Sequence, residues 1–185
     1  LEEKLDRLQK GDILILAGSI PASLAQTTYE RILARLEGRD IRAVVDATRD
    51  LLVNVLRYKP FLIKPNNHEL SEIAGVKLTN DNEIVTAARM MQAKGARNVL
   101  VSMAGDGALL LDEQGGVHRI GCPKGKVVNS VGAGDSMVAG FVAGYQQSGG
   151  DYAAALKLGT ACGSATAFSL GLATKADIDK LLKTM

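Results

Sequence analysis

One short stretch of the chain combines very small side chains with a single carboxylate. In "VNSVGAGDSMVAGF", Gly132, Ala133 and Gly134 stand directly before Asp135 and an apolar, helix-like segment. The first N–H groups of a helix have no partner inside it and carry the positive end of the helix dipole. Small residues there let an anion approach, with Asp135 beside it. The alternative is a glycine turn with Asp135 as a helix-capping acid, and the spacing leaves both interpretations open.

The standard nucleotide-binding motifs do not describe this stretch. A P-loop has Lys and then Ser or Thr after its glycines, whereas Asp135 follows Gly134 here. The dinucleotide fingerprint has a third glycine where this chain has Met137. An anion site at this turn would therefore belong to another class of protein.

A second stretch, "KPNNHE" from Lys64 to Glu69, ends an apolar strand-like run. Asn66 followed by Glu69 is typical of a capping box at a helix start, which is the favoured interpretation of these residues alone. Ligands in open α/β sheets, however, bind beyond the carboxyl ends of strands, where Asn66 is expected. Mg²⁺ takes few protein oxygens besides water and phosphate, so this pair is also a candidate metal environment.

Two further stretches have simpler explanations. In "VSMAGDGALLL", Gly105, Asp106 and Gly107 indicate a turn between two strands. In "LGTACGSATAF", small residues at helical spacing favour close packing of one helix against another.

The elements that must position these residues alternate between strands and helices. Apolar runs predict buried strands over 13–18, 42–47, 61–66 and 98–103, and a hairpin over 107–120 that turns at 114–116. A strand-like segment is expected over 126–128. The spacing predicts helices over 24–36 with Ser23 as cap, 50–58, 69–74, 84–94 with a capping box from Asn80 and Glu83, 134–147, 152–170, and one capped by Thr174 with Asp177. This order predicts an α/β domain with a mainly parallel sheet.

Composition excludes several classes of protein. The 185 residues are 46% hydrophobic with a net charge of +2, so a nucleic-acid or membrane partner is not expected. Cys122 and Cys162 lack metal or disulfide spacing, which is typical of a cytoplasmic protein. His68 and His118 fit no zinc or Ser-His pattern.

The three glycine and asparagine motifs together resemble the ribokinase-like sugar kinases of the PfkB family. In that family GAGD opens a long helix, N-x-x-E shapes the magnesium environment, and V-S/T-x-G-x-x-G binds the nucleotide. The resemblance covers essentially the whole chain. It implies an α/β fold, a ribokinase-like three-layer αβα sandwich with a mainly parallel sheet and an antiparallel edge hairpin, whose N-terminal part and lid lie outside the chain.

The resemblance also implies a role for each matching residue. Asp135 would be the catalytic base, and the N–H groups of Gly132, Ala133 and Gly134 would form an anion hole. Glu69 would bind Mg²⁺ through water. The residues implied in ATP binding are Lys64, Asn66, Ser102, Met103, Ala104, Gly105, Asp106, Gly107, Gly134 and Asp135. Small residues of the 152–170 helix, Ala161, Cys162 and Ser164, would wall the adenine pocket.

One position departs from the family pattern. Ala104 stands where the family has glycine, and alanine fits easily only if the backbone there keeps a negative φ.

The substrate and the extent of the protein are further expectations. The sequence around Lys64 and Asp135 is most similar to the 1-phosphofructokinase and tagatose-6-phosphate kinase branch of the family. That similarity implies an ATP- and Mg²⁺-dependent kinase of a small sugar phosphate, with fructose 1-phosphate as first candidate. Tagatose-6-phosphate kinase and 6-phosphofructokinase activities are the alternatives. Lys124 and Lys126 are candidate partners of the sugar phosphate, or solvated surface lysines.

The chain begins at Leu1, inside a helix-like segment closed by Gly11. We therefore expect residues 1–185 to be the C-terminal, nucleotide-binding and catalytic portion of a single domain, with a homodimer conceivable through the lid. The competing hypotheses are a non-catalytic nucleotide-binding module and a structural domain with incidental glycine turns.

Overall fold

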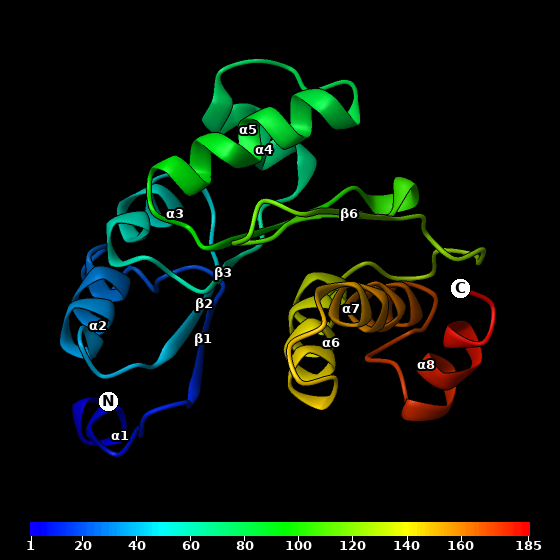
Figure 1. Ribbon diagram of the computed structural model, residues 1–185. Coiled ribbons are helices and arrows are strands. Elements are labelled where there is room, and N and C mark those ends of the chain that lie inside the picture. The colour runs from blue at the N-terminus through cyan, green and yellow to red at the C-terminus, as the bar shows by residue number, and fades with distance from the viewer. The chain divides into compact units, whose positions relative to one another are not determined.

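The computed structural model describes residues 1–185, which form two compact units, Leu1–Val101 and Ser102–Met185 (Figure 1). The expectation of one domain over 1–185 stays a prediction. The elements of the first unit are α1 (Glu2–Asp6), β1 (Ile13–Ala17), α2 (Thr28–Leu36), β2 (Arg42–Asp46), α3 (Arg49–Val55), the 3₁₀ turn η1 (Leu56–Tyr58), β3 (Leu62–Ile63), α4 (Asn67–Ala74), α5 (Asp81–Ala93) and β4 (Asn98–Ser102).

The strands of the first unit are parallel and adjacent in chain order. Val44 lies opposite both Ile15 of β1 and Leu62 of β3, and Leu62 lies opposite Asn98 of β4. Because β2, β3 and β4 are covered, their central side chains are apolar without alternation, as in other parallel sheets. β1 stands at the end of the strand order, and its Ile15 is 41% exposed.

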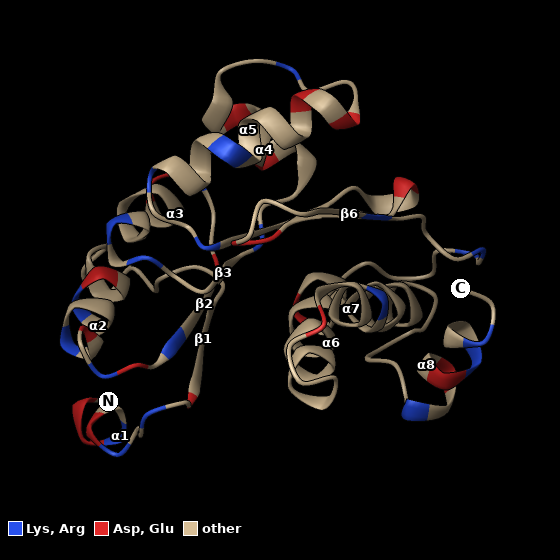
Figure 2. Cartoon of the chain, in the orientation of Figure 1, with Lys and Arg blue, Asp and Glu red and all other residues tan.

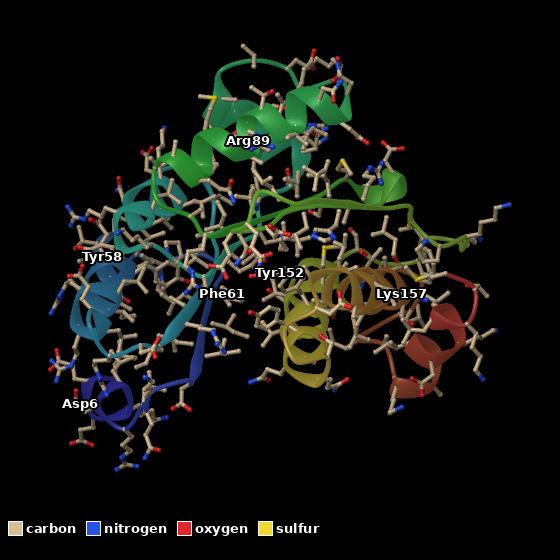
Figure 3. The ribbon with its side chains drawn as sticks, viewed as in Figure 1. Asp6, Tyr58, Phe61, Arg89, Tyr152 and Lys157 are labelled. Carbon is tan, nitrogen blue, oxygen red and sulfur yellow. The ribbon has the colours of Figure 1, made fainter.

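Phe61, labelled in Figure 3, directly precedes β3 and is fully buried. The guanidinium groups of Arg42 and Arg97 lie 5.7 and 5.4 Å from its ring centroid. These cations lie over the ring face, a geometry that stabilises the strand entry by electrostatic attraction to the ring.

The second unit contains the turn η2 (Ala104–Asp106), the antiparallel strands β5 (Ala108–Leu111) and β6 (Val117–Ile120), and the helices α6 (Ala133–Gln147), α7 (Tyr152–Ala167) and α8 (Lys175–Leu182). α7 lies between α6 and α8 (Figure 1). None of the helices is long and apolar enough to span a membrane.

α6 and α7 are almost free of charge, as Figure 2 shows, with Asp135 the one acid of α6 and Lys157 the one base of α7. Small residues bring the two helices into contact. A Cβ at Gly140 would lie 2.6 Å from Cys162 Sγ, and one at Gly159 would lie 2.9 Å from the carbonyl oxygen of Met137. The packing expected from "LGTACGSATAF" is confirmed, and it leaves no room for a methyl group at these glycines.

The β5–β6 turn is organised by one buried carboxylate. Asp112 accepts hydrogen bonds from the N–H groups of Gln114 (2.8 Å) and Gly116 (2.9 Å), and its other oxygen lies 2.7 Å from His118 Nε2. A side chain at Gly116 would overlap this carboxylate, which explains the glycine. Burial raises the pKa of Asp112, but the hydrogen bonds from His118, Gly116 and Gln114 outweigh it, and the net pKa is lowered.

This carboxylate predicts an acid-dependent loss of stability. A carboxyl group whose pKa is lowered by folding stabilises the folded state above its unfolded pKa of about 4, and that contribution is lost as pH falls through the folded pKa. We expect Asp112→Asn to be less stable than wild type by roughly 1–3 kcal/mol at pH 7. The difference in the free energy of unfolding between wild type and Asp112→Asn, measured by guanidinium unfolding, should narrow as pH falls from 4 to 3. A gap that is constant with pH would show that ionisation of Asp112 contributes nothing.

Several predicted elements differ at their ends. The helix predicted with Ser23 as cap begins only at Thr28, and Leu24 is half exposed, so that cap is wrong. The helix predicted up to Gly11 ends at Asp6, and no strand forms over 126–128. Asn80 caps α5 as expected, but the Glu83 carboxylate accepts from Thr79 rather than closing the box.

Candidate functional site

α6 begins without a capping side chain. Its N-cap, Gly132, has a left-handed φ of +79°, and a Cβ there would lie 3.0 Å from Leu172 Cδ2. The N–H of Ala133 donates to the carbonyl oxygen of Ser130 (3.2 Å), and that of Ser136 donates to Gly132 (2.9 Å). The N–H groups left without a partner at this helix start are therefore those of Gly132, Gly134 and Asp135. Asp135 is exposed beside them, which is the arrangement an anion site requires.

This finding refines the expected anion hole. Ala133 was expected to offer its N–H group to a phosphate, but that group is already engaged with Ser130. Gly132 supplies the left-handed turn, and the N–H groups of Gly132, Gly134 and Asp135 are the available donors.

The segment before Gly132 is tied to the end of α7, a feature that sequence reasoning missed. The N–H groups of Val128 and Asn129 both donate to the carbonyl oxygen of Ala167, at 2.8 and 3.1 Å. The Asn129 amide also donates to Leu170 O (3.2 Å) and accepts from the Val131 N–H (3.1 Å). These bonds replace the expected strand over 126–128. The only signal for them in the sequence is an asparagine just before the glycines.

Lys64 lies at the carboxyl end of β3, as predicted, but it is not free. Its ammonium nitrogen lies 3.2 Å from Asp46 Oδ1, and its side chain is 7% exposed. Asp46 ends the adjacent parallel strand β2, where the residues one step earlier, Val45 and Ile63, are register partners. Burial, and then the negative charge of Asp46, raise the pKa of Tyr29. Asp46 is a residue that the sequence analysis overlooked, and the pattern of an acid ending a buried strand, "RAVVDA", could have found it.

Asn66 and Glu69 form the capping box that was the favoured interpretation of those residues alone. Asn66 Oδ1 accepts from the Glu69 N–H (2.9 Å), and Glu69 Oε2 accepts from the Asn66 N–H (2.7 Å). The capping box uses only one of the two carboxylate oxygens of Glu69, and its Oε1 is not part of the box. Asn67, the residue after Asn66, has a buried Oδ1 without a hydrogen-bond partner. Oxygen acceptors near a strand end fit a water-coordinated Mg²⁺, which needs few direct protein ligands.

The loop 102–107 is a short, hydrogen-bonded turn at the end of β4. The N–H of Met103 donates to Gly107 O (2.9 Å), and the N–H of Gly107 donates to Ala104 O (3.0 Å). Ser102 is partly buried, Met103 is buried, and the three residues Ala104, Gly105 and Asp106 are exposed. A Cβ at Gly107 would overlap the carbonyl oxygen of Ile120, so this glycine is required by the close approach of β6.

Ala104 does not keep the negative φ that would suit alanine. Its φ is +48°, in the left-handed region where a Cβ is unfavourable. Ala104→Gly should therefore raise the free energy of unfolding by about 1 kcal/mol, measured by guanidinium unfolding. Ala93→Gly, the same change at an exposed residue of α5 whose φ is not positive, is the control and should lower the stability of the protein. An Ala104→Gly variant no more stable than wild type would show that the turn carries no strain.

The remaining candidates have ordinary surroundings. Ala161, Cys162 and Ser164 are buried in α7; burial raises the pKa of the Cys162 thiol, and Ser164 Oγ lies 3.6 Å from Cys122 Sγ. Cys162 also lines a groove of about 490 Å³ between α6, α7 and α8, which none of the predicted catalytic residues borders. Lys124 and Lys126 are exposed, as solvated surface lysines are.

The predicted residues thus fall into local groups. Lys64, Asn66 and Glu69 stand together at the β3–α4 junction of the first unit. The loop 102–107 and the start of α6 belong to the second unit.

Comparison with known proteins shows what this arrangement is similar to. Residues 1–179 match the family described as pfkB family carbohydrate kinase. The chain is 47% identical over 180 residues to the 1-phosphofructokinase of Bacillus subtilis, covering 97% of this chain and 59% of the relative. It is 36% identical to the D-tagatose-1-phosphate kinase of Bacillus licheniformis, covering 100% of this chain and 59% of that protein.

Solved structures agree with the sequence relatives. Phosphofructokinase-2 from Escherichia coli, in complex with substrates and products, matches 99% of this chain and 60% of its own length with a TM-score of 0.90 and 27% identity. The ribokinase of Arabidopsis thaliana, at 19% identity and a TM-score of 0.82, shows the same fold. The expected ribokinase-like α/β fold is therefore confirmed. The chain spans less than two thirds of the length of these proteins.

Proposed function

The chain belongs to the pfkB family of carbohydrate kinases, and from this premise we propose that the whole protein phosphorylates a ketohexose phosphate at the expense of ATP. The observation that carries the proposal is the start of α6, where the N–H groups of Gly134 and Asp135 are unpaired beside an exposed carboxylate. Phosphoryl transfer requires alignment and neutralisation of charge more than covalent help from the protein. An uncapped helix start with an adjacent base supplies both.

Each residue group has a part in this scheme. The N–H groups of Gly134 and Asp135 would hold the oxygens of the transferring phosphoryl group, and the Asp135 carboxylate would accept the proton of the attacking sugar hydroxyl. The loop 102–107 would carry the nucleotide. The bond that forms joins the sugar oxygen to γ-phosphorus, and the bond that breaks releases ADP.

Lys64 and a Mg²⁺ ion near Glu69 would neutralise the negative charge of the ATP phosphates. Lys64 is fixed by Asp46 and would offer its remaining N–H donors to ATP phosphate oxygens, with Asn66 beside it. Glu69 would hold Mg²⁺ through water, and when bound this ion supplies neutralisation of phosphate charge. A buried ammonium group without a partner is costly. The Asp46 carboxylate and the ATP phosphates would both be partners of Lys64, which accounts for a lysine in this buried position.

We propose fructose 1-phosphate as the acceptor, which would give fructose 1,6-bisphosphate. In support, the B. subtilis relative named 1-phosphofructokinase is 47% identical, above the 36% of the tagatose-1-phosphate kinase. A tagatose phosphate and fructose 6-phosphate are the alternatives, and a homodimer is a further possibility for the whole protein.

The test is a coupled ADP-release assay on the whole protein with fructose 1-phosphate, fructose 6-phosphate, tagatose 1-phosphate and tagatose 6-phosphate, alongside calorimetric titration with ATP. We expect Mg²⁺-dependent ADP release with the highest kcat/KM for fructose 1-phosphate. ATP binding without turnover on any of these would support a nucleotide-binding module instead. Absence of ATP binding would reject both.

A further inference from the structure

We propose that Thr166, near the end of α7, is a positioning residue that holds the first turn of α6 in its reactive geometry; the inference rests on the proposed function of that turn. The Thr166 hydroxyl donates a hydrogen bond to Ser136 Oγ (2.9 Å) and accepts one from the N–H of Ala173 (3.2 Å). Ser136 directly follows Asp135, and its own N–H closes the first turn on Gly132. One hydroxyl thus joins the turn that carries Asp135 to the segment that follows α7.

The chemistry of this contact requires a hydroxyl. Thr166 is 1% exposed, so its hydroxyl is held away from water. A hydroxyl can donate one hydrogen bond and accept another at the same time, whereas the methyl group of valine can do neither. Removing it would leave both the Ser136 hydroxyl and the Ala173 N–H without this partner.

Two close approaches of the same face of α7 to the start of α6 accompany this hydroxyl. A Cβ built at Gly132 would lie 4.0 Å from Thr166 Cγ2, which places the threonine methyl beneath the left-handed glycine. One turn earlier on α7, a Cβ at Gly163 would lie 3.0 Å from the Ala133 carbonyl oxygen. Residues three apart share a helix face, so Gly163 and Thr166 support the turn at Ala133 and Ser136, on either side of Gly134 and Asp135.

A tightly supported turn matters because phosphoryl transfer depends on placement. A displacement of about 1 Å at a reacting group can reduce turnover roughly 100-fold. Loss of the Thr166 hydroxyl would let the first turn of α6 move while the helix stayed folded. The expected signature is a fall in kcat with little change in the binding of either substrate.

α7 provides its own control. Thr160 is also 1% exposed, but its hydroxyl has no hydrogen-bond partner. Thr160→Val makes the same chemical change in the same helix and removes a group that is buried without compensation. It should leave turnover unchanged and stability equal or higher.

The experiment compares wild type, Thr166→Val, Thr166→Ser and Thr160→Val in the whole protein, assayed below the melting temperature of each. For Thr166→Val we expect kcat to fall roughly 10-fold or more, with KM for ATP and sugar phosphate within about twofold of wild type. Thr166→Ser keeps the hydroxyl and should recover most of the turnover. Equal turnover of Thr166→Val and wild type, or an equal loss in Thr166→Ser, would overturn the proposal.

A second readout separates this inference from the proposed function. Amide hydrogen exchange at Ala133 and Ser136, whose N–H groups are bonded to Ser130 and Gly132, should be faster in Thr166→Val than in wild type, while the C-terminal half of α6 is unchanged. If the wild type transfers no phosphoryl group, the proposed function fails, and exchange alone then decides the structural part. Unchanged exchange at the first turn of α6 would refute the positioning role.

Discussion

Replacing Asp135 by Asn in the whole protein is expected to lower kcat by roughly 100-fold or more, with little change in ATP affinity. Asparagine keeps the shape and the helix-terminal position of aspartate but cannot accept the proton of the attacking hydroxyl. Because the transition state of phosphoryl transfer is loose, the placement of the base matters more than its strength. The measurement is steady-state turnover together with a calorimetric Kd for ATP.

The chain offers a matched control for this substitution. Asp151 is the N-cap of the neighbouring helix α7, where its carboxylate accepts hydrogen bonds from the N–H groups of Ala153 (2.8 Å) and Ala154 (3.1 Å). Asparagine is an equally good N-cap, so Asp151→Asn should leave kcat unchanged. Near-normal turnover in Asp135→Asn would refute the catalytic role and favour the interpretation of Asp135 as a helix-terminal acid only.

Removing Asp46 is expected to cause a large loss of stability. Asp46→Ala leaves the Lys64 ammonium group in a nearly covered position without its carboxylate partner. Breaking a buried ion pair on one side typically costs about 3–5 kcal/mol. The prediction is a corresponding decrease in the free energy of unfolding, obtained from guanidinium curves at pH 7.

Two controls identify the cause of that loss. The double variant Asp46→Leu with Lys64→Met removes both charges and should be far more stable than Asp46→Ala, although it should lose kinase activity. Asp179→Ala breaks the exposed pair of Lys175 and Asp179, whose nitrogen–oxygen distance is 2.6 Å, and should change stability little. Equal stability of Asp46→Ala and wild type would mean that water already screens the ammonium of Lys64.

The elements with strong local signals were predictable from the sequence. The parallel strands and β5 carry apolar runs, β6 follows a glycine turn, and the capping boxes at Asn66 and Thr174 have their partners three residues away. The helix predicted to begin after Ser23 begins only at Thr28. There the cap pattern was present and the packing was not, since Leu24 stays half exposed.

The site was predictable at the positions that carry motifs and not at those that support them. Gly132 and Asp135 follow from residue type and spacing, because a left-handed turn and an acid leave a visible pattern. The partners Asp46 and Thr166 are single polar residues in apolar segments, and their contacts cross between elements distant in sequence. The same limit explains Ala104, whose strained φ is set by the tertiary path of the turn and not by its neighbours in the chain.

The most direct test is a crystal structure of the whole protein with a non-hydrolysable ATP analogue, Mg²⁺ and fructose 1-phosphate. Our account predicts that oxygens of the terminal phosphate accept hydrogen bonds from the N–H groups of Gly134 and Asp135, with the Asp135 carboxylate about 3 Å from the acceptor hydroxyl. A terminal phosphate bound elsewhere, with those N–H groups facing only solvent, would contradict it.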